Sequence, residues 1–238
     1  MEESVKKTSW KQRIGIAIVA AILLGSSVAM YIMIVLSSGG TNSAITEERI
    51  AELQSQYEEK YTEYEKQAKV IAEANLPVLS NYRSRVTAYN NETANSGGIV
   101  KTDLKTGTGA DITSDTTGYG AYYIGWCADE TVFDSSFDDF TNPTALKAPL
   151  VVEKGALIEG WYTGLDGMKV GGVREITIPG AFAYGEDYDP CGNDGKNVPL
   201  KFVIMTLDLS EDFRKLAKEV SDLYTEMMYA YYSLEGSN

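Results

Sequence analysis

Residues 157–185 read LIEGWYTGLDGMKVGGVREITIPGAFAYG, in which closely spaced glycines separate short runs of apolar and β-branched residues. The same texture extends over residues 97–209. Short alternating runs at 121–126, 172–178 and 200–209 are typical of antiparallel strands joined by turns. The sequence therefore predicts a compact β-rich domain over residues 97–209.

Five aromatic side chains are scattered along this domain, several of them beside glycines or at the expected ends of strands: Tyr123, Phe133, Trp161, Tyr184 and Phe202. Taken alone, such residues indicate a hydrophobic core. The short motifs around them are more informative than the residues themselves.

These motifs follow one another in an order that resembles the FKBP-type peptidyl-prolyl cis-trans isomerases. They are YIG at 123–125, FDSS at 133–136, LIEGW at 157–161, Gly164, MKVGG at 168–172, Arg174, IP at 178–179, AYG at 183–185 and LKF at 200–202. The blocks cover about 110 of the 238 residues. The resemblance implies an α+β fold, with a bent antiparallel β-sheet wrapped on a short helix that starts near Leu157 and a shallow apolar pocket between them.

The resemblance also implies roles for individual residues. Trp161 would form the floor of the pocket, and its walls would be Tyr123, Phe133, Leu157, Ile158 and Phe202. The Ile158 N–H and the Tyr184 hydroxyl would donate hydrogen bonds to substrate carbonyls, and the Asp134 carboxylate would lie at the rim. The candidate catalytic residues are then Tyr123, Asp134, Ile158 and Tyr184, and the candidate substrate-binding residues are Phe133, Leu157, Trp161 and Phe202. No cofactor is implied.

The implied reaction suits the composition of the chain. Rotation of an Xaa-Pro bond gives up amide resonance against a barrier of about 18 to 20 kcal/mol, but it breaks no covalent bond. A twisted amide is less charge-separated than a planar one, so an apolar, partly dry pocket favours it. The chain contains no histidine, which excludes Ser-His-Asp and Cys-His nucleophiles and His-ligated zinc, but not this chemistry.

Two segments depart from the family's pattern. Residues 148–150 read APL where family members usually carry an aromatic-x-aromatic strand, so one pocket wall is expected to be missing. The loop at 186–199, EDYDPCGNDGKNVP, is acidic and lacks the common aliphatic-Pro-Pro stretch, which leaves Tyr188 and Val198 as substitutes. These departures predict weaker or wider proline binding. They also leave open an alternative function, a catalytically weak or inactive binding or scaffold module of a membrane assembly.

The two cysteines lie at the end of the 121–126 run and in the acidic loop. In an oxidising compartment Cys127 and Cys191 would form a disulfide that ties the loop to the strand, and two independent thiols are the alternative. The acidic loop offers oxygen ligands, but their spacing does not fit an EF-hand, so no metal site is expected. The net charge of -13, from 34 acidic and 21 basic residues, repels phosphate backbones and argues against nucleic-acid binding.

The N-terminal part predicts a membrane anchor. Residues 15–36 carry no charge and would be about 33 Å long as a helix, enough to cross a bilayer core. An apolar MYIMIVL run directly follows the small-x-small site at 27–29, which favours an uncleaved anchor over a signal peptide. The preceding tail is net positive, whereas the rest of the chain carries 17 basic and 32 acidic residues, so the N-terminus is expected in the cytoplasm.

Amphipathic helices flank the β-rich domain. After an N-cap at Thr46, a heptad-like apolar stripe predicts a helix that Pro77 interrupts, and a second helical stretch is expected near 78–89. The first stripe consists of Ile50, Leu53, Tyr57, Tyr61, Tyr64, Ala68 and Ile71. A C-terminal helix capped by Ser210 has its stripe at Phe213, Leu216, Val220, Leu223, Met227 and Tyr231. We expect the stripes to pack within one chain, with a dimer seam or a client cradle as the alternatives.

The predicted organisation has five parts: a cytoplasmic basic tail (1–13), a transmembrane signal anchor (14–36), a linker with amphipathic helices (37–96), an FKBP-like isomerase domain (97–209) and a C-terminal amphipathic helix (210–238). The predicted function is that of a prolyl isomerase outside the cytoplasm, tethered to the cell membrane by a single pass, which assists the folding of exported proteins. Its partners would be proline-containing unfolded, surface or secreted polypeptides and the lipid bilayer through residues 14–36, with a homodimer left open.

Overall fold

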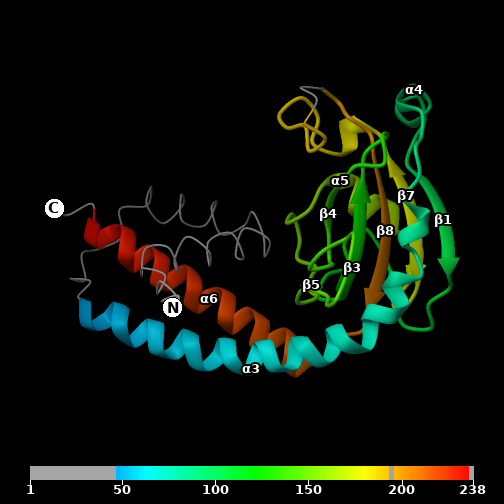
Figure 1. The fold of residues 1–238 in the computed structure, drawn as a ribbon. Helices are drawn as coiled ribbons and strands as arrows, with labels where there is room; N and C mark the ends of the chain where they lie inside the picture. Colours follow the sequence, from blue (N-terminus) through cyan, green and yellow to red (C-terminus); the bar gives the residue numbers. More distant parts are fainter. Residues whose placement is uncertain (1–46, 193–195, 236–238) are drawn as a thin grey trace, which may run out of the picture.

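The computed structural model describes residues 47–192 and 196–235, which form an antiparallel sheet and a long two-helix arm (Figure 1). The main sheet has the strand order β1-β7-β8-β3-β4, and β5 pairs with the first two residues of β3, Gly120 and Ala121. A small second sheet pairs β2 with β6. The strands are β1 (Val100–Lys105), β2 (Asp111–Ile112), β3 (Gly120–Trp126), β4 (Val132–Ser135), β5 (Leu150–Val151), β6 (Met168–Lys169), β7 (Val173–Ile178) and β8 (Leu200–Leu207). The predicted antiparallel β-rich domain is thus present.

The strands at the centre of the sheet are buried on both faces. Successive residues of a strand point to opposite sides, and in β3 Ala121 and Tyr123 face one hydrophobic cluster while Tyr122 and Ile124 face another. Helix α5 (Glu159–Leu165) covers the first face through Trp161 and Leu165. The later part of α3 (Glu47–Ser80) covers the second face through side chains that include Ala72 and Leu79. The predicted sheet wrapped on a short helix is therefore found, with a second helix on its outer face.

Helices α3 and α6 (Glu211–Glu235) pack on each other as the arm (Figure 1). They run antiparallel, because Arg49 pairs with Glu226 at 2.6 Å (Nη2–Oε1) and Lys60 pairs with Glu219 at 2.7 Å (Nζ–Oε2). Their seam is aromatic, and the rings of Tyr64 and Phe213 stack with centroids 5.4 Å apart. The prediction that the amphipathic stripes pack within one chain is confirmed for these two helices.

The stripe predicted for the C-terminal helix is correct only in its first half. Phe213 and Val220 are buried as expected, but beyond them Tyr224 and Met228 are buried, not Leu223 and Met227. A straight α-helix has 3.6 residues per turn, so the buried side drifts by one position over successive turns when the partner helix does not supercoil tightly.

Two helix predictions near Pro77 are wrong. Helix α3 runs through Pro77 and ends at Ser80. The proline removes one backbone donor close to the end of the helix, while Leu76, Val78 and Leu79 gain contacts with the outer face of the sheet. The second helical stretch expected over 78–89 is absent, and only a short 3-10 turn, η1 (Arg83–Arg85), is found there.

The segment after η1 bonds to the end of the sheet instead of forming a helix. Trp126 Nε1 donates to the Thr87 carbonyl at 3.1 Å, and the Tyr89 N–H donates to the Ala128 carbonyl at 3.0 Å. These tertiary hydrogen bonds take the place of helical ones. The following loop contains a short helix, α4 (Asn91–Asn95), whose cap Asn90 accepts from the Thr93 N–H at 2.8 Å.

The predicted anchor at 14–36, the basic tail, the linker and the Thr46 cap lie outside the described residues. Among the helices that the structure does describe, none combines the length and apolar character that a membrane crossing requires.

The cap of α6 gives a first testable prediction. Ser210 Oγ accepts a hydrogen bond from the Phe213 N–H at 3.1 Å, as expected for an N-cap. Replacing Ser210 with alanine is expected to lower the free energy of unfolding by about 1 kcal/mol, measured by urea denaturation. Ser221→Ala, in the middle of the same helix, is the control and should cost nothing; an equal loss in both variants would contradict a capping role.

Candidate functional site

Four aromatic rings from four different elements meet on the α5 side of the sheet. Trp161 of α5 and Phe202 of β8 are 3% and 4% exposed, and their ring centroids lie 5.9 Å apart. Tyr123 of β3 meets Trp161 edge-on at 5.5 Å, and Phe133 of β4 meets Phe202 edge-on at 5.6 Å. These four residues are called the aromatic cluster below. All four were predicted from the sequence as pocket residues.

Glycines in the quoted motifs let these elements approach one another. Gly125 of β3 lies opposite Phe202, and a Cβ there would stand 2.7 Å from the Phe202 ring and 2.8 Å from the Phe133 ring. A Cβ at Gly164 would stand 2.9 Å from Ile176 Cδ1, so α5 rests directly on β7. A side chain at Gly125 would push the rings of the aromatic cluster apart, and one at Gly164 would push α5 away from β7.

A buried arginine fixes the end of α5. Arg174 donates from Nη1 to the carbonyls of Gly164 and Asp166, both at 3.0 Å, and its Nε pairs with Asp103 Oδ1 at 2.6 Å. A cation at a helix C-terminus satisfies carbonyls that have no partner within the helix. Arg174 therefore holds the helix that carries Trp161 against the sheet.

The start of α5 is held by its own side chains. Ile158 is the N-cap in an extended conformation, and its carbonyl accepts from the Trp161 N–H at 3.0 Å. The Tyr162 hydroxyl accepts from the Leu157 N–H at 3.1 Å and donates to the Glu153 carbonyl at 2.6 Å. Leu157 and Ile158 are half-buried and pack against the same hydrophobic cluster as Trp161. The helix itself begins at Glu159, two residues after the predicted start near Leu157.

The Asp134 carboxylate lies at the edge of the aromatic cluster. The Tyr123 hydroxyl donates a short hydrogen bond to Asp134 Oδ2. Burial of the phenol, reinforced by the negative charge of Asp134, raises the pKa of Tyr123 well above its ordinary value, so the hydroxyl remains a donor. Lys147 Nζ lies 3.7 Å from Asp134 Oδ1 and donates to the Ser135 carbonyl at 2.8 Å. Asp134 is thereby held between a phenol and an ammonium group.

Lys147 is a site residue that the sequence did not reveal. It belongs to no motif, and it reaches Asp134 because residues 145–147 pair with residues 136–138: the Asp138 N–H donates to the Ala145 carbonyl and the Lys147 N–H donates to the Ser136 carbonyl. Only this non-local pairing brings the two charges together.

Two tyrosines form an exposed rim. Tyr184 and Tyr188 are 38% and 59% exposed, and their rings meet edge-on at 5.2 Å. Burial and the nearby charge of Asp134 raise the pKa of Tyr184. Val198 was expected, with Tyr188, to replace the family's aliphatic-Pro-Pro stretch. It is half-buried against the hydrophobic cluster that contains Trp161.

Residues 148–150, where one pocket wall is expected to be missing, carry no aromatic side chain. Ala148 is exposed, Pro149 is buried, and Leu150 is half-buried against the hydrophobic cluster that contains Trp161. The strand β5 that follows is short and pairs with β3 only at Gly120 and Ala121. On this side the hydrophobic cluster that contains Trp161 is bounded by an aliphatic residue, Leu150.

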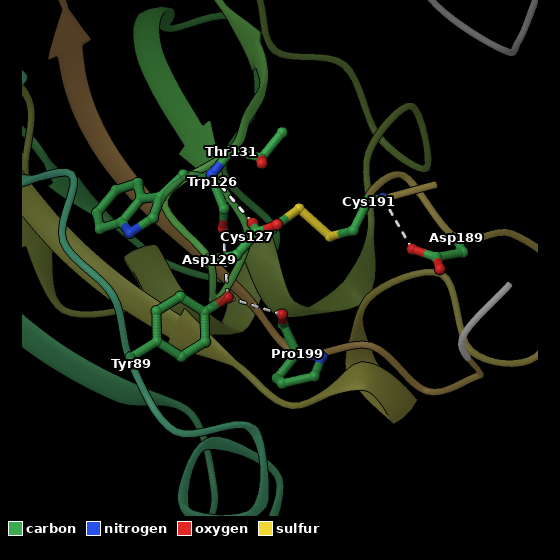
Figure 2. The surroundings of a disulfide bond; sticks show 8 residues. All are labelled: Tyr89, Trp126, Cys127, Asp129, Thr131, Asp189, Cys191 and Pro199. Carbon is green, nitrogen blue, oxygen red and sulfur yellow. Dashed lines mark hydrogen bonds between the residues drawn. A yellow bond between two sulfur atoms is a disulfide. The ribbon is translucent and has the colours of Figure 1, made fainter. Parts of the chain in front are cut away.

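Cys127 and Cys191 form a disulfide, with Cα atoms 6.0 Å apart (Figure 2). The bridge joins the end of β3 to the loop that carries Tyr184 and Tyr188. The Tyr89 hydroxyl strengthens the same corner by donating to the Pro199 carbonyl at 2.8 Å, just before β8 begins (Figure 2). Of the two alternatives that the sequence left open, the bridged one is present.

No group of three or more potential metal-ligating side chains is found among residues 47–192 and 196–235. Part of the acidic loop, including Asn193 and Asp194, lies outside these residues.

Comparisons with known proteins agree with this geometry. The family model for FKBP-type peptidyl-prolyl cis-trans isomerase matches residues 115–207. An FK506-binding protein of Neisseria meningitidis serogroup B is 36% identical over 91 residues, which are 37% of this chain and 76% of that protein. FK506-binding protein 4 of Rhizopus delemar is 33% identical over 112 residues, which are 47% of this chain but only 27% of that longer protein.

The crystal structure of AtFKBP13 aligns with 47% of this chain and 93% of its own at 24% identity, with a TM-score of 0.36. The residues that the family model matches, 115–207, include the strands and the helix that hold the aromatic cluster. Through this domain, the chain belongs to the family of FKBP-type peptidyl-prolyl cis-trans isomerases.

Proposed function

We propose that this isomerase is tethered to the cell membrane, that it acts outside the cytoplasm on proline-containing segments of exported polypeptides, and that the aromatic cluster is its catalytic pocket. The observation that carries the proposal is the aromatic cluster with Asp134 at its edge. An apolar floor binds the flat proline ring and excludes water from the amide. Because a twisted amide is less charge-separated than a planar one, such a pocket lowers the barrier to rotation.

Three groups have complementary roles in the proposed pocket. Trp161 and Phe202 supply apolar surface, Tyr184 offers a hydroxyl to a substrate carbonyl, and Asp134 supplies a fixed negative charge at the rim. The hydrogen bond from Tyr123 and the ammonium group of Lys147 keep this charge in place. The buried rings and Asp134 are thus preorganised before substrate arrives, and such preorganisation is a main source of catalysis when no covalent step occurs.

The location of the enzyme is supported by two features. Disulfides persist in oxidising compartments and are rare in the cytosol, and this chain has one between Cys127 and Cys191. The tail before the apolar run at 15–36 contains four Lys and Arg residues, whereas residues 37–56 after it contain one. The positive-inside rule associates this bias with a domain outside the cytoplasm. Protease added to intact cells should degrade the isomerase domain, whereas protection until the membrane is opened would contradict the proposed orientation.

The aromatic pocket is tested by a pair of neighbouring tyrosines. Tyr123→Phe removes the hydroxyl that donates to Asp134, and a hydrogen bond to a charged group contributes about 1.5 to 3 kcal/mol. We expect kcat/KM for the peptide Ala-Leu-Pro-Phe to fall about tenfold. Tyr122→Phe is the matched control, because Tyr122 lies on the opposite face of β3 and its buried hydroxyl has no hydrogen-bond partner among the described residues. Equal activities of the two variants would contradict the assignment.

The aliphatic wall at residues 148–150 favours one alternative, a weakly catalytic binding module. This alternative predicts that the full chain binds proline-containing peptides but leaves their cis-trans exchange at the spontaneous rate. The proposed enzyme instead accelerates exchange at protein concentrations far below that of the peptide.

A further inference from the structure

A groove of about 730 Å³ lies between α3 and residues 144–148, outside the aromatic cluster. Its floor is apolar and includes small residues on α3, so the groove is concave rather than flat. The apolar lining residues are Tyr61, Tyr64, Ala68, Ala72, Leu76, Ala145, Leu146 and Ala148. Pockets of 300 to 1,000 Å³ with mainly apolar linings are typical of binding sites.

The wall opposite α3 is rigid. Asp138 accepts hydrogen bonds from the backbone N–H groups of Thr144 and Ala145 and from the Thr144 hydroxyl, at 2.5 to 3.1 Å. These hydrogen bonds hold the pKa of Asp138 far below its ordinary value, and the bond from the Thr144 hydroxyl has the largest effect. Leu146 is anchored by pairing with Phe137. The groove is therefore formed before anything binds, which reduces the entropic cost of binding.

The same wall separates the groove from the isomerase site. Leu146 and Ala148 line the groove, whereas Lys147 between them extends its ammonium group to Asp134 at the edge of the aromatic cluster. Neighbouring side chains of an extended segment point to opposite sides. A bound polypeptide that passes Lys147 near Asp134 would therefore reach the groove at the small residue Ala148.

The rim of the groove carries both signs of charge. Glu65, Lys66, Lys69 and Glu73 stand along α3, and Lys69 pairs with Glu73 at 3.8 Å. Such a rim does not select a charged ligand. The Tyr64 hydroxyl is buried beneath the floor and has no hydrogen-bond partner among the described residues. The accessible floor is therefore an apolar side-chain surface, which suits an extended, apolar peptide.

We infer that the groove between α3 and residues 144–148 binds an extended, apolar stretch of the polypeptide whose proline is held at the isomerase site. This inference rests on the proposed function of the aromatic cluster. It makes α3 part of the substrate-binding surface and predicts that long apolar clients are bound better than short peptides.

The test compares short and long substrates with the full chain in detergent micelles. The short substrate is Ala-Leu-Pro-Phe, and the long ones add eight residues of Leu, Val and Ala to its amino or carboxyl end. Matched peptides with eight Ser and Gly residues control for length. We expect KM for one of the apolar extended peptides to be about tenfold lower than for the short one, with no gain from the Ser-Gly extensions.

Two variants assign this gain to the groove. Ala145→Trp fills the groove from an exposed position and should abolish the gain while leaving the activity on the short peptide unchanged. Val70→Trp is the control, because Val70 is 65% exposed on α3 and does not line the groove. Should Ala145→Trp fail to fold, Thr62→Trp fills the groove from the α3 side. Equal KM values for all peptides, or a gain that survives filling of the groove, would overturn the inference.

A proline-free apolar peptide of eight residues separates this inference from the proposed function. Its binding, followed by fluorescence polarisation, should be lost in Ala145→Trp whether or not the short peptide is isomerised. If the groove is instead covered by a second copy of the chain, the particle mass in micelles will be that of a dimer and Ala145→Trp will halve it; that result would also overturn the inference.

Discussion

Replacing both Cys127 and Cys191 with alanine is expected to lower the free energy of unfolding by about 4 kcal/mol. The two residues are 64 positions apart, so the bridge closes a long loop of the unfolded chain. Its loss increases the entropy of the unfolded state much more than it changes the contacts of the folded one. Urea denaturation followed by tryptophan fluorescence measures the difference.

Reductant supplies the control for this prediction. Reduced wild-type protein should be about as unstable as the double alanine variant, and the variant should not respond to reductant. The bridge also holds the loop that carries Tyr184 and Tyr188, so KM should rise while the aromatic cluster persists. A stability difference below about 1 kcal/mol between oxidised and reduced protein would contradict the expected contribution of the bridge.

Replacing Trp161 with alanine is expected to have two effects of different origin. The loss of a ring that is 3% exposed leaves a cavity, which costs about 3 to 5 kcal/mol of stability. The ring is also the proposed floor under the proline, and an apolar contact of this size contributes about 2 kcal/mol to binding. We therefore expect kcat/KM to fall about thirtyfold in the fraction of protein that remains folded.

Trp126 provides the matched control for the catalytic effect. It is fully buried on the opposite face of the sheet, in the cluster covered by α3. Trp126→Ala should therefore destabilise the protein by a similar amount, about 3 to 5 kcal/mol, without a comparable loss of kcat/KM. If both variants lost activity in proportion to stability, Trp161 would be a core residue only.

The isomerase domain was predictable because its motifs encode local geometry. A Cβ at Gly125 would meet the rings of Phe202 and Phe133, and one at Gly164 would meet the Ile176 side chain. Arg174 satisfies the last carbonyls of α5, the helix in which the LIEGW motif ends. The alternation of residues along β3 and β8 also assigns each side chain to one face of the sheet. Each requirement demands one residue type at one position, so it is visible in short, recognisable motifs.

The predictions from sequence are wrong or incomplete where tertiary contacts determine the local structure. Pro77 is a helix breaker by itself, yet α3 continues to Ser80 because its last turn packs on the sheet. The segment 86–89 forms no helix, because hydrogen bonds from Trp126 and to Ala128 hold it against the sheet. Lys147 reaches Asp134 only through strand pairing, and the sequence could not decide whether cysteines 64 residues apart meet.

The central claim is that the aromatic cluster speeds rotation about Xaa-Pro bonds. It is tested most directly by exchange NMR of Ala-Leu-Pro-Phe with catalytic amounts of the full chain in detergent micelles. We predict that the cis-to-trans rate rises in proportion to protein concentration, and that Trp161→Ala largely removes this increase while Trp126→Ala retains it. A spontaneous rate in the presence of folded wild-type protein would contradict the account.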